Sequence, residues 1–227
     1  MQYSTFAAID IGSYDVILEI FEISKKQGIR SVDKICHRME LGKDTYTLGK
    51  IRPEMEEELC RVLADFVRIM EGYRVDAYRA MASSAISEAA NSLYVLGKIR
   101  QLTGLSVTVL SNSEQRFLGY KALAAMEDNF NKIIEKGTAI LDLDGGSFQI
   151  SLFDKDALVT TQNIRMGSLR IRERLAGIQS ETEHYEEMVE ELIWNEVSSF
   201  KKMYLKDRKI ENIMLIGDVF TDSVYQL

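Results

Sequence analysis

The stretch Asp10–Phe21 reads DIGSYDVILEIF, and the stretch Asp142–Phe153 reads DLDGGSFQISLF. Each begins with an aspartate at the end of an apolar run, turns through glycine and serine, and continues with alternating residues that end in phenylalanine. Alternation on both sides of a glycine turn is typical of two antiparallel strands joined by a tight turn. Two copies of one strand–turn–strand unit predict an internal duplication, with one copy in each half of the chain.

The rest of the chain alternates short apolar runs with longer stretches of helical periodicity, which predicts an α/β protein. The polar stretch Asp128–Gly137 precedes the second copy, so we expect a first lobe at residues 1–127 and a second lobe at residues 128–227. The expected strands outside the two hairpins are residues 29–41, 75–82, 106–110 and 213–216, and the expected helices are residues 53–73, 84–104, 113–126 and 180–205.

The composition is that of a soluble globular protein, with 46% apolar and 28% charged residues in a chain of 227. Cys36 and Cys60 are isolated from each other in sequence, which favours reduced thiols and a cytoplasmic location. The net charge of -7 argues against a nucleic-acid surface. No apolar run is long enough to cross a membrane, and no signal peptide is recognisable, so no membrane partner is expected.

The repeated turn has the composition of an anion-binding loop. Glycines allow backbone N–H groups to converge on one point, and serine hydroxyls add neutral donors. The candidate phosphate-binding residues are Gly12 and Ser13 in the first copy and Gly145, Gly146 and Ser147 in the second. Asp10 and Asp142 would repel bare phosphate, so their recurrence predicts a cation such as Mg²⁺ between carboxylate and phosphate. The alternative is two ordinary hairpins whose glycines only permit the turn.

Both loops resemble those of a known family. The first is similar to D-I-G-S-N-S and the second to D-I-G-G-G-S-T-E of the exopolyphosphatases and guanosine pentaphosphate phosphohydrolases, the Ppx/GppA family of the actin-like superfamily. Further segments match family motifs in the same order along nearly the whole chain: Leu41-Gly42, residues 82–91 (ASSAISEAAN), residues 110–116 (LSNSEQR), residues 166–174 (MGSLRIRER) and Ile216-Gly217.

The resemblance implies a duplicated actin-like (ribonuclease H-like) fold, with two lobes and a phosphate-binding cleft between them. It implies hydrolysis of a terminal phosphoanhydride of polyphosphate or guanosine pentaphosphate, with Mg²⁺ held by Asp142 and supported by Asp10. Arg170 matches an arginine of the family motif and is a candidate phosphate contact. Family members continue beyond the last matched motif, so we expect the second lobe to be shortened or truncated at its C-terminal end.

The catalytic base implied by the resemblance is a glutamate in the motif at residues 110–116. Glu114 falls on the first of two family glutamates and Gln115 on the second, which family spacing favours as the base. Glutamine is not a useful proton acceptor, and loss of a general base costs about 10²–10⁴-fold in rate. Glu114 could substitute, although adjacent helix positions point about 100° apart.

Other departures from the family pattern leave the activity open. Asp144 replaces a loop glycine, Gln149 replaces a glutamate, Ser87 replaces an arginine and Phe220 stands where the family has glycine. One hypothesis is a hydrolase with impaired activity, and the alternative is a non-catalytic regulator or scaffold that binds a phosphorylated ligand. An actin-like ATPase is disfavoured because Asp218-Val219-Phe220 lacks the glycine pair that a nucleotide would need. The sequence leaves the ligand open, and also whether the chain forms a homodimer.

Overall fold

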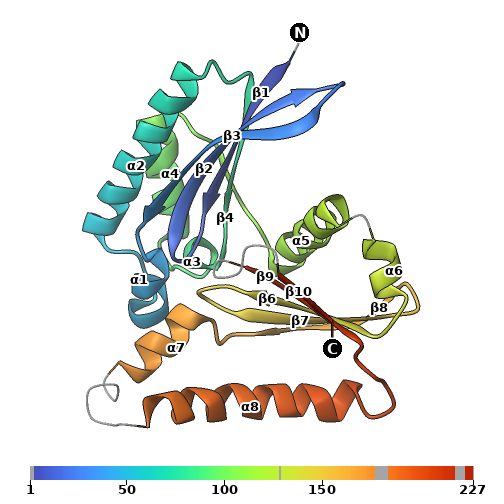
Figure 1. Cartoon of the computed structure of the whole chain (residues 1–227). Helices are drawn as coiled ribbons and strands as arrows, with labels where there is room; N and C mark the ends of the chain where they lie inside the picture. Colours follow the sequence, from blue (N-terminus) through green and yellow to red (C-terminus); the bar gives the residue numbers. More distant parts are fainter. Residues whose placement is uncertain (1–2, 128, 177–183, 218–222, 227) are drawn as a thin grey trace. The chain divides into compact units, whose positions relative to one another are not determined.

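The computed structural model describes residues 3–127, 129–176, 184–217 and 223–226, and these form two compact units, Met1–Asn112 and Ser113–Leu227 (Figure 1). The sequence-based boundary at 127/128 differs from this division because helix α5 (Asn112–Met126) packs with the second unit. Its residues Tyr120 and Leu123 contact a core built from Phe130, Ile134 and residues of the second sheet.

The first unit contains one sheet and four helices among its described residues. Strands β1 and β2 form the first predicted hairpin, and the strand order is β3-β2-β1-β4-β5. β2 is antiparallel to β1 and β3, while β4 is parallel to β1 and β5. The elements are β1 (Ser4–Ile11), β2 (Asp15–Ser24), β3 (Gly28–Arg38), α1 (Leu41–Leu48), α2 (Pro53–Gly72), β4 (Ala77–Ala82), α3 (Ser84–Ser87), α4 (Ser92–Thr103) and β5 (Val107–Val109).

The second unit repeats this sheet. Its strand order is β10-β9-β6-β7-β8, in which β6, β7, β8 and β9 take the places of β1, β2, β3 and β4. The pairing differs only at the last strand, because β10 is antiparallel to β9. After α5 the elements are α6 (Phe130–Ile134), β6 (Thr138–Leu143), β7 (Phe148–Asp154), β8 (Ala157–Ile164), α7 (Ser168–Leu175), α8 (Tyr185–Tyr204), β9 (Asn212–Gly217) and β10 (Ser223–Gln226).

The duplication extends to the residue register. Asp10 pairs with Ile17 in the first hairpin, and Asp142 pairs with Gln149 in the second. A register irregularity follows at equivalent places, between Ile20 and Phe21 in the first sheet and between Leu152 and Phe153 in the second. The predicted α/β class with two duplicated sheets is therefore confirmed.

Several elements differ from the prediction. Residues 84–104 form two helices, because the Asn91 side chain bonds both backbone groups of Ile51, at 3.0 Å from Ile51 N and 2.8 Å to Ile51 O, and separates α3 from α4. The predicted helix at 180–205 begins at Tyr185 within the described residues, and Glu181 and Glu183 lie outside them. The short elements α1, α6, α7, β8 and β10 were not predicted, since so few residues carry little periodicity.

The two sheets are covered differently. In the first unit, one continuous core lies on the face that carries α1, α2 and α4, and includes Ile9, Leu18 and Leu63. In the second unit, α8 lies along one face of the sheet and α5 and α6 on the other (Figure 1). β7 accordingly buries residues toward both faces, with Ile150 toward α8 and Phe153 toward α6. None of the described helices is long and apolar enough to span a membrane.

Candidate phosphate-binding loops

The first loop joins β1 to β2 through a four-residue turn. Gly12 N–H donates to the carbonyl of Asp15 at 2.9 Å, and a Cβ at Gly12 would lie 2.9 Å from that same oxygen. The carbonyls of Ser13 and Tyr14 accept N–H groups from residues 39, 40 and 42, at and before the start of α1. Because C=O and N–H point in opposite directions across a trans peptide, the N–H groups of Tyr14 and Asp15 point away from α1.

The second loop has the same backbone arrangement. Asp144 N–H donates to the carbonyl of Ser147 at 3.0 Å, as Gly12 does to Asp15. The carbonyl of Asp144 accepts from Ser168, and that of Gly145 accepts from Leu169 and Arg170, all at the start of α7. The Gly146 carbonyl accepts Arg170 Nε at 2.9 Å. By the same peptide geometry, the N–H groups of Gly145, Gly146 and Ser147 point away from α7, and successive N–H groups of this kind form an anion-binding nest.

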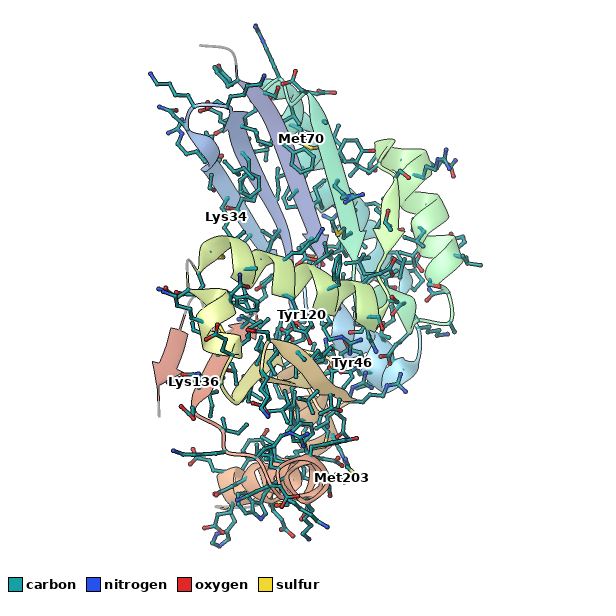
Figure 2. All side chains as sticks on the ribbon, turned by 90° about the vertical axis from the view of Figure 1, so that its right-hand side faces the viewer. Lys34, Tyr46, Met70, Tyr120, Lys136 and Met203 are labelled. Atoms are coloured by element: carbon teal, nitrogen blue, oxygen red, sulfur yellow. The ribbon has the colours of Figure 1, made fainter. Side chains whose placement is uncertain are left out.

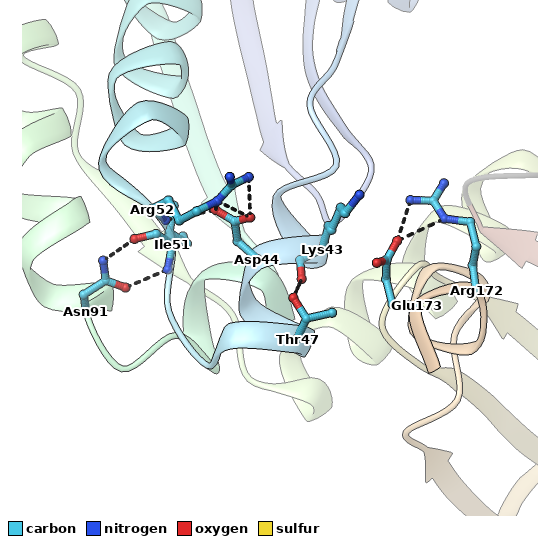
Figure 3. Close-up of polar contacts among 8 residues, drawn as sticks. All are labelled: Lys43, Asp44, Thr47, Ile51, Arg52, Asn91, Arg172 and Glu173. Carbon is cyan, nitrogen blue, oxygen red and sulfur yellow. Dashed lines mark hydrogen bonds and ion pairs between the residues drawn. The ribbon is translucent and has the colours of Figure 1, made fainter. Parts of the chain in front are cut away.

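In each unit, the loop is held against the helix that follows the third strand of the sheet. A Cβ at Gly167, the residue before α7, would lie 2.4 Å from backbone atoms of Asp144 and Gly145. In the first unit, an ion pair at 2.9 Å between the buried Asp44 of α1 and Arg52 fixes the position of α1 (Figure 3). Arg52 precedes α2, so the position of the first loop depends on the junction between α1 and α2.

A chain of hydroxyl groups backs the first loop. Ser13 is buried, and its Oγ lies 2.6 Å from Tyr46 Oη, which lies 2.8 Å from Ser84 Oγ. Tyr46 belongs to α1 and Ser84 to α3, which follows β4. Sequence reasoning identified Ser13 but missed Tyr46 and Ser84, because the helical pattern of α1 spans only two turns and gave no reason to place Tyr46 beside the loop.

A side-chain contact joins the second loop to helix α5. Gln115, on α5, donates from Nε2 to Asp144 Oδ2 at 2.6 Å. Of the two candidate catalytic positions on α5, Gln115 therefore contacts the loop, whereas Glu114 is exposed. An amide facing a carboxylate is a favourable charge-assisted hydrogen bond. The side chains at 115 and 144 are thus complementary to each other, and the loop carries an acidic side chain.

A row of oxygen-bearing side chains crosses the second sheet beside this pair. Asp142 pairs with Gln149 across β6 and β7, and Gln149 pairs with Asn163 across β7 and β8, so the three lie side by side on one face. This is the face that α5 covers, because Tyr120 donates to Ser151 Oγ at 2.5 Å; Figure 2 labels Tyr120 on α5. Asn163 belongs to no recognised motif, so it was not a candidate in the sequence analysis.

This row has the donors that Mg²⁺ prefers. Gln149 is 3% exposed, and its Oε1 and the Oδ1 of Asn163 are buried atoms that have no hydrogen-bond partner in the described part of the chain. Buried oxygens of this kind are normally satisfied by hydrogen bonds or ions. Among the described residues, no group of three His, Cys, Asp or Glu side chains could hold a metal. The oxygens of Asp142, Gln149 and Asn163 are nevertheless of the type that Mg²⁺ binds, with one carboxylate among them, and the assignment of Asp142 to a metal stays a prediction.

The remaining candidates are dispersed. Asp10, at the end of β1, is exposed, and Ser87 is an exposed residue at the end of α3. Val219, Phe220 and Thr221 lie outside the described residues. The assignments of Gly12, Ser13, Gly145, Gly146, Ser147 and Arg170 to phosphate, of Asp10 and Asp142 to metal and of Glu114 and Gln115 to catalysis stay predictions.

The family model for "Ppx/GppA phosphatase family" matches residues 19–226. The chain belongs to the Ppx/GppA phosphatase family. A bifunctional 3-dehydroquinate synthase/phosphatase from Fusobacterium nucleatum is 22% identical over 174 residues, which cover 74% of this chain and 26% of that protein. Exopolyphosphatase 1 from Mycobacterium leprae is 26% identical over 144 residues, covering 63% of this chain and 41% of that protein. The chain thus spans well under half the length of these curated relatives.

Solved structures agree in fold. A Ppx/GppA family member from Aquifex aeolicus superposes with a TM-score of 0.70 at 22% identity, covering 96% of this chain and 67% of that one. This similarity and that to other members of the superfamily show the actin-like fold that the sequence predicted. The family assignment made from the two loops and the further matched segments is confirmed as well.

Proposed function

We propose that this chain binds the terminal phosphates of polyphosphate or of a guanosine pentaphosphate-type ligand and hydrolyses the terminal phosphoanhydride. The observation that carries the proposal is the second loop, in which the carbonyls of residues 144–146 are bound on one side and the following N–H groups are directed to the other. Such a nest favours a phosphate group, and glycine at 145 and 146 permits close approach. The first loop, with Gly12 and Ser13, repeats the arrangement.

A divalent cation would be held by Asp142 and the amide oxygen of Gln149, with Asp10 of the first hairpin as the proposed supporting carboxylate. Mg²⁺ bound there would neutralise phosphate charge and polarise the terminal phosphoryl group. The Asp142 carboxylate would orient the phosphoanhydride through that ion, and the N–H groups of Gly145 and Gly146 would hold the non-bridging oxygens. Arg170, which already donates to Gly146, would stiffen the loop and lend it positive charge.

Hydrolysis requires a group that orients the attacking water. Asp144 is suited to this role because Gln115 fixes one of its oxygens at 2.6 Å and so restrains the carboxylate at the edge of the loop. The Asp144 carboxylate would accept a proton from water as the water oxygen bonds to the terminal phosphorus, while the bond from phosphorus to the bridging oxygen breaks and that oxygen leaves with the shortened chain. Glu114 remains the alternative carboxylate, on the exposed side of α5.

Release of inorganic phosphate from polyphosphate and from guanosine pentaphosphate tests this function. We expect release that depends on Mg²⁺, and Asp142→Ala should abolish it. The same ligands with Mg²⁺ should also raise the melting temperature, with a stabilisation of about 2.7 kcal/mol at a hundredfold excess over the dissociation constant. An unchanged melting curve and no phosphate release at millimolar ligand would contradict the proposal.

A non-catalytic phospho-ligand-binding role is the second candidate. Two features support it: the side chain that α5 brings to the second loop is the amide of Gln115, which is not a proton acceptor, and Ser87 is an exposed serine where the resemblance would place a guanidinium that could clamp phosphate. In this case the ligands and Mg²⁺ should still raise the melting temperature, and Asp142→Ala should remove that response, but no phosphate would be released by the wild-type chain.

A further inference from the structure

Arg116 of helix α5 is a partly buried arginine that is held by neutral hydroxyl groups. Its Nη1 donates to Thr161 Oγ1 of β8 at 3.0 Å, and its Nη2 donates to Ser113 Oγ at 3.1 Å. Within the described ranges of the chain, Arg116 makes no ion pair with an aspartate or a glutamate. A guanidinium has five N–H donors and a permanent positive charge, and two hydroxyl groups leave that charge uncompensated.

The other partly buried arginines contact more strongly negative oxygens. Among the described residues three arginines are partly buried, namely Arg116, Arg170 and Arg172, and all the others are exposed. Arg172 forms an ion pair with Glu173 at 3.0 Å, and Arg170 donates to the carbonyl of Gly146 at 2.9 Å. Removing a charged group from water costs free energy, which an opposite charge normally offsets. The charge of Arg116 is therefore one that a bound anion would compensate.

The contact between Arg116 and β8 lies next to the row of oxygens on the second sheet. Thr161 pairs with Ser151 of β7, and Asn163 pairs with Gln149, so Thr161 and Asn163 are two residues apart on the same face of β8. Two residues of a strand span about 7 Å. Asn163 and Gln149 belong to the row whose oxygens suit a divalent cation. The guanidinium is thus fastened one strand repeat away from the proposed cation site.

Arg116 also lies at the end of α5 that meets the second loop. Gln115, the residue before it, donates to Asp144 of that loop at 2.6 Å. Ser113 is three residues before Arg116, so its hydroxyl holds the guanidinium toward the start of the helix and hence toward the loop. The exposed carboxylate of Glu114 belongs to a residue about 200° around the helix from Arg116, on the opposite side. A positive charge therefore flanks both the loop and the row of oxygens.

We propose that Arg116 is a specificity-determining residue, which binds the phosphate next to the one in the second loop and so selects ligands with several linked phosphates. This inference rests on the proposed function, since it extends the same loop. A cation at Asp142 neutralises part of the ligand's charge, and the planar guanidinium would donate to non-bridging oxygens of the neighbouring phosphate. Because Thr161 and Ser113 already hold the side chain, less conformational entropy is lost when the ligand binds.

Isothermal titration calorimetry of the whole chain with inorganic phosphate, diphosphate and tripolyphosphate, at constant free Mg²⁺, tests the proposal. The wild type should bind tripolyphosphate more tightly than inorganic phosphate. Arg116→Gln should weaken tripolyphosphate binding by about tenfold or more, because charge-assisted hydrogen bonds are lost, and should leave the affinity for inorganic phosphate nearly unchanged. Lys121→Gln is the matched control, because it removes one positive charge from an exposed position of the same helix, and it should change neither affinity.

A second pair of variants separates phosphate binding from a purely structural role. If Arg116 only fastens α5 to β8, Thr161→Val should weaken tripolyphosphate binding as much as Arg116→Gln does, because it removes the hydroxyl acceptor and keeps the guanidinium. Under the proposal, Thr161→Val retains most of the preference for tripolyphosphate. Arg116→Lys retains part of it, because lysine keeps the charge without the planar fork.

Two results overturn the role of Arg116 and leave the proposed function of the loop intact. One is equal tripolyphosphate affinity in the wild type and Arg116→Gln, and the other is an equal loss in Arg116→Gln and Thr161→Val. A wild type that binds none of the three ligands overturns the proposed function and this inference together. Circular dichroism verifies that each variant is folded.

Discussion

The two glycine loops of this chain share one backbone and differ in their side chains. In each, the first N–H of the turn donates to the fourth carbonyl, and the start of the next helix binds the central carbonyls. The first loop opens with Gly12, where a Cβ would lie 2.9 Å from Asp15 O, whereas the second opens with Asp144, whose side chain meets Gln115. The duplicated fold therefore supplies two turns with one backbone arrangement, and side chains at equivalent positions distinguish them.

The largest effect is expected at the position where the loops differ most. If Asp144 orients the attacking water, Asp144→Asn should lower phosphate release about 10²–10⁴-fold, because the amide cannot take the place of the carboxylate. Asp156→Asn, in the turn between β7 and β8, is the control for loss of one acidic group from the same sheet.

Variants at Gln115 also test the role of Asp144, because the two side chains are hydrogen-bonded to each other. Gln115→Glu alone would place two carboxylates at the 2.6 Å contact and should not raise the rate, because like charges disfavour both ionised forms. Adding Asp144→Gly removes the repulsion and returns the carboxylate to α5, so the double variant should recover most of the activity lost in Asp144→Gly. If Gln115→Glu alone raises turnover, Asp144 is not the group that orients water.

The helices on equivalent faces of the two sheets should differ in stability. Leu63→Ala in α2 removes a side chain that is 0% exposed, and should lower the free energy of unfolding by about 2–5 kcal/mol. Ile193→Ala in α8 removes a partly exposed side chain that already borders a cavity, so about 1 kcal/mol or less is expected. Urea unfolding followed by circular dichroism and by Trp194 fluorescence measures both. Equal losses would show that α8 is packed as well as α2.

The hairpins, the long helices and the family could be predicted because each rests on a local pattern. The Asp10–Phe21 and Asp142–Phe153 copies fix strand, turn and strand within twelve residues, and the α2 pattern runs for twenty. The break between α3 and α4 could not be predicted in this way, because it depends on a bond from Asn91 to Ile51, forty residues away. The assignment of α5 to the second unit likewise depends on packing, which its own weak periodicity does not reveal.

The candidate site was predictable only where a motif carries it. Gly145, Gly146 and Ser147 were candidates because glycine and serine suit a turn that binds anions, and their assignment to phosphate stays a prediction. Gln115 and Asp144 were interpreted from the resemblance as separate departures, and their complementarity emerges only from the 2.6 Å contact between α5 and the loop. Asn163 belongs to β8, which was not predicted, so its place beside Gln149 could not be inferred.

Substitution of Gly167 tests whether close backbone contact holds the second loop against α7. Gly167→Ala would place a Cβ 2.4 Å from the backbone of Asp144 and Gly145, so the loop or α7 must shift. We expect a loss of about 1–3 kcal/mol of stability and weaker phosphate binding. Thermal unfolding with and without ligand measures both, and Gly97→Ala, where nothing lies within 4 Å of the added Cβ, is the control. If Gly167→Ala changes neither stability nor phosphate binding, the second loop is not anchored on α7.

The smallest expected effect is on the alkylation rate of Cys36, a probe that is available only in the first unit. The chain's two cysteines both lie in the first unit, and Cys36 is an exposed residue of β3. Partial burial, followed by the negative charge of Asp15 at the end of the first loop, raises the pKa of the Cys36 thiol. A raised pKa means a smaller thiolate fraction at pH 8, so alkylation of Cys36 should be slow. Asp15→Asn should lower the pKa of the Cys36 thiol and speed its alkylation, because a negative charge that disfavours the thiolate is removed. Peptide mapping by mass spectrometry follows Cys36 separately from Cys60, whose pKa is raised mainly by burial.

Phosphate bound at the first loop would add negative charge near Cys36 and slow the reaction, whereas binding at the second loop alone would leave the rate unchanged. If Asp15→Asn does not change the rate, the charge of Asp15 does not reach the thiol, and Cys36 cannot report on the first loop.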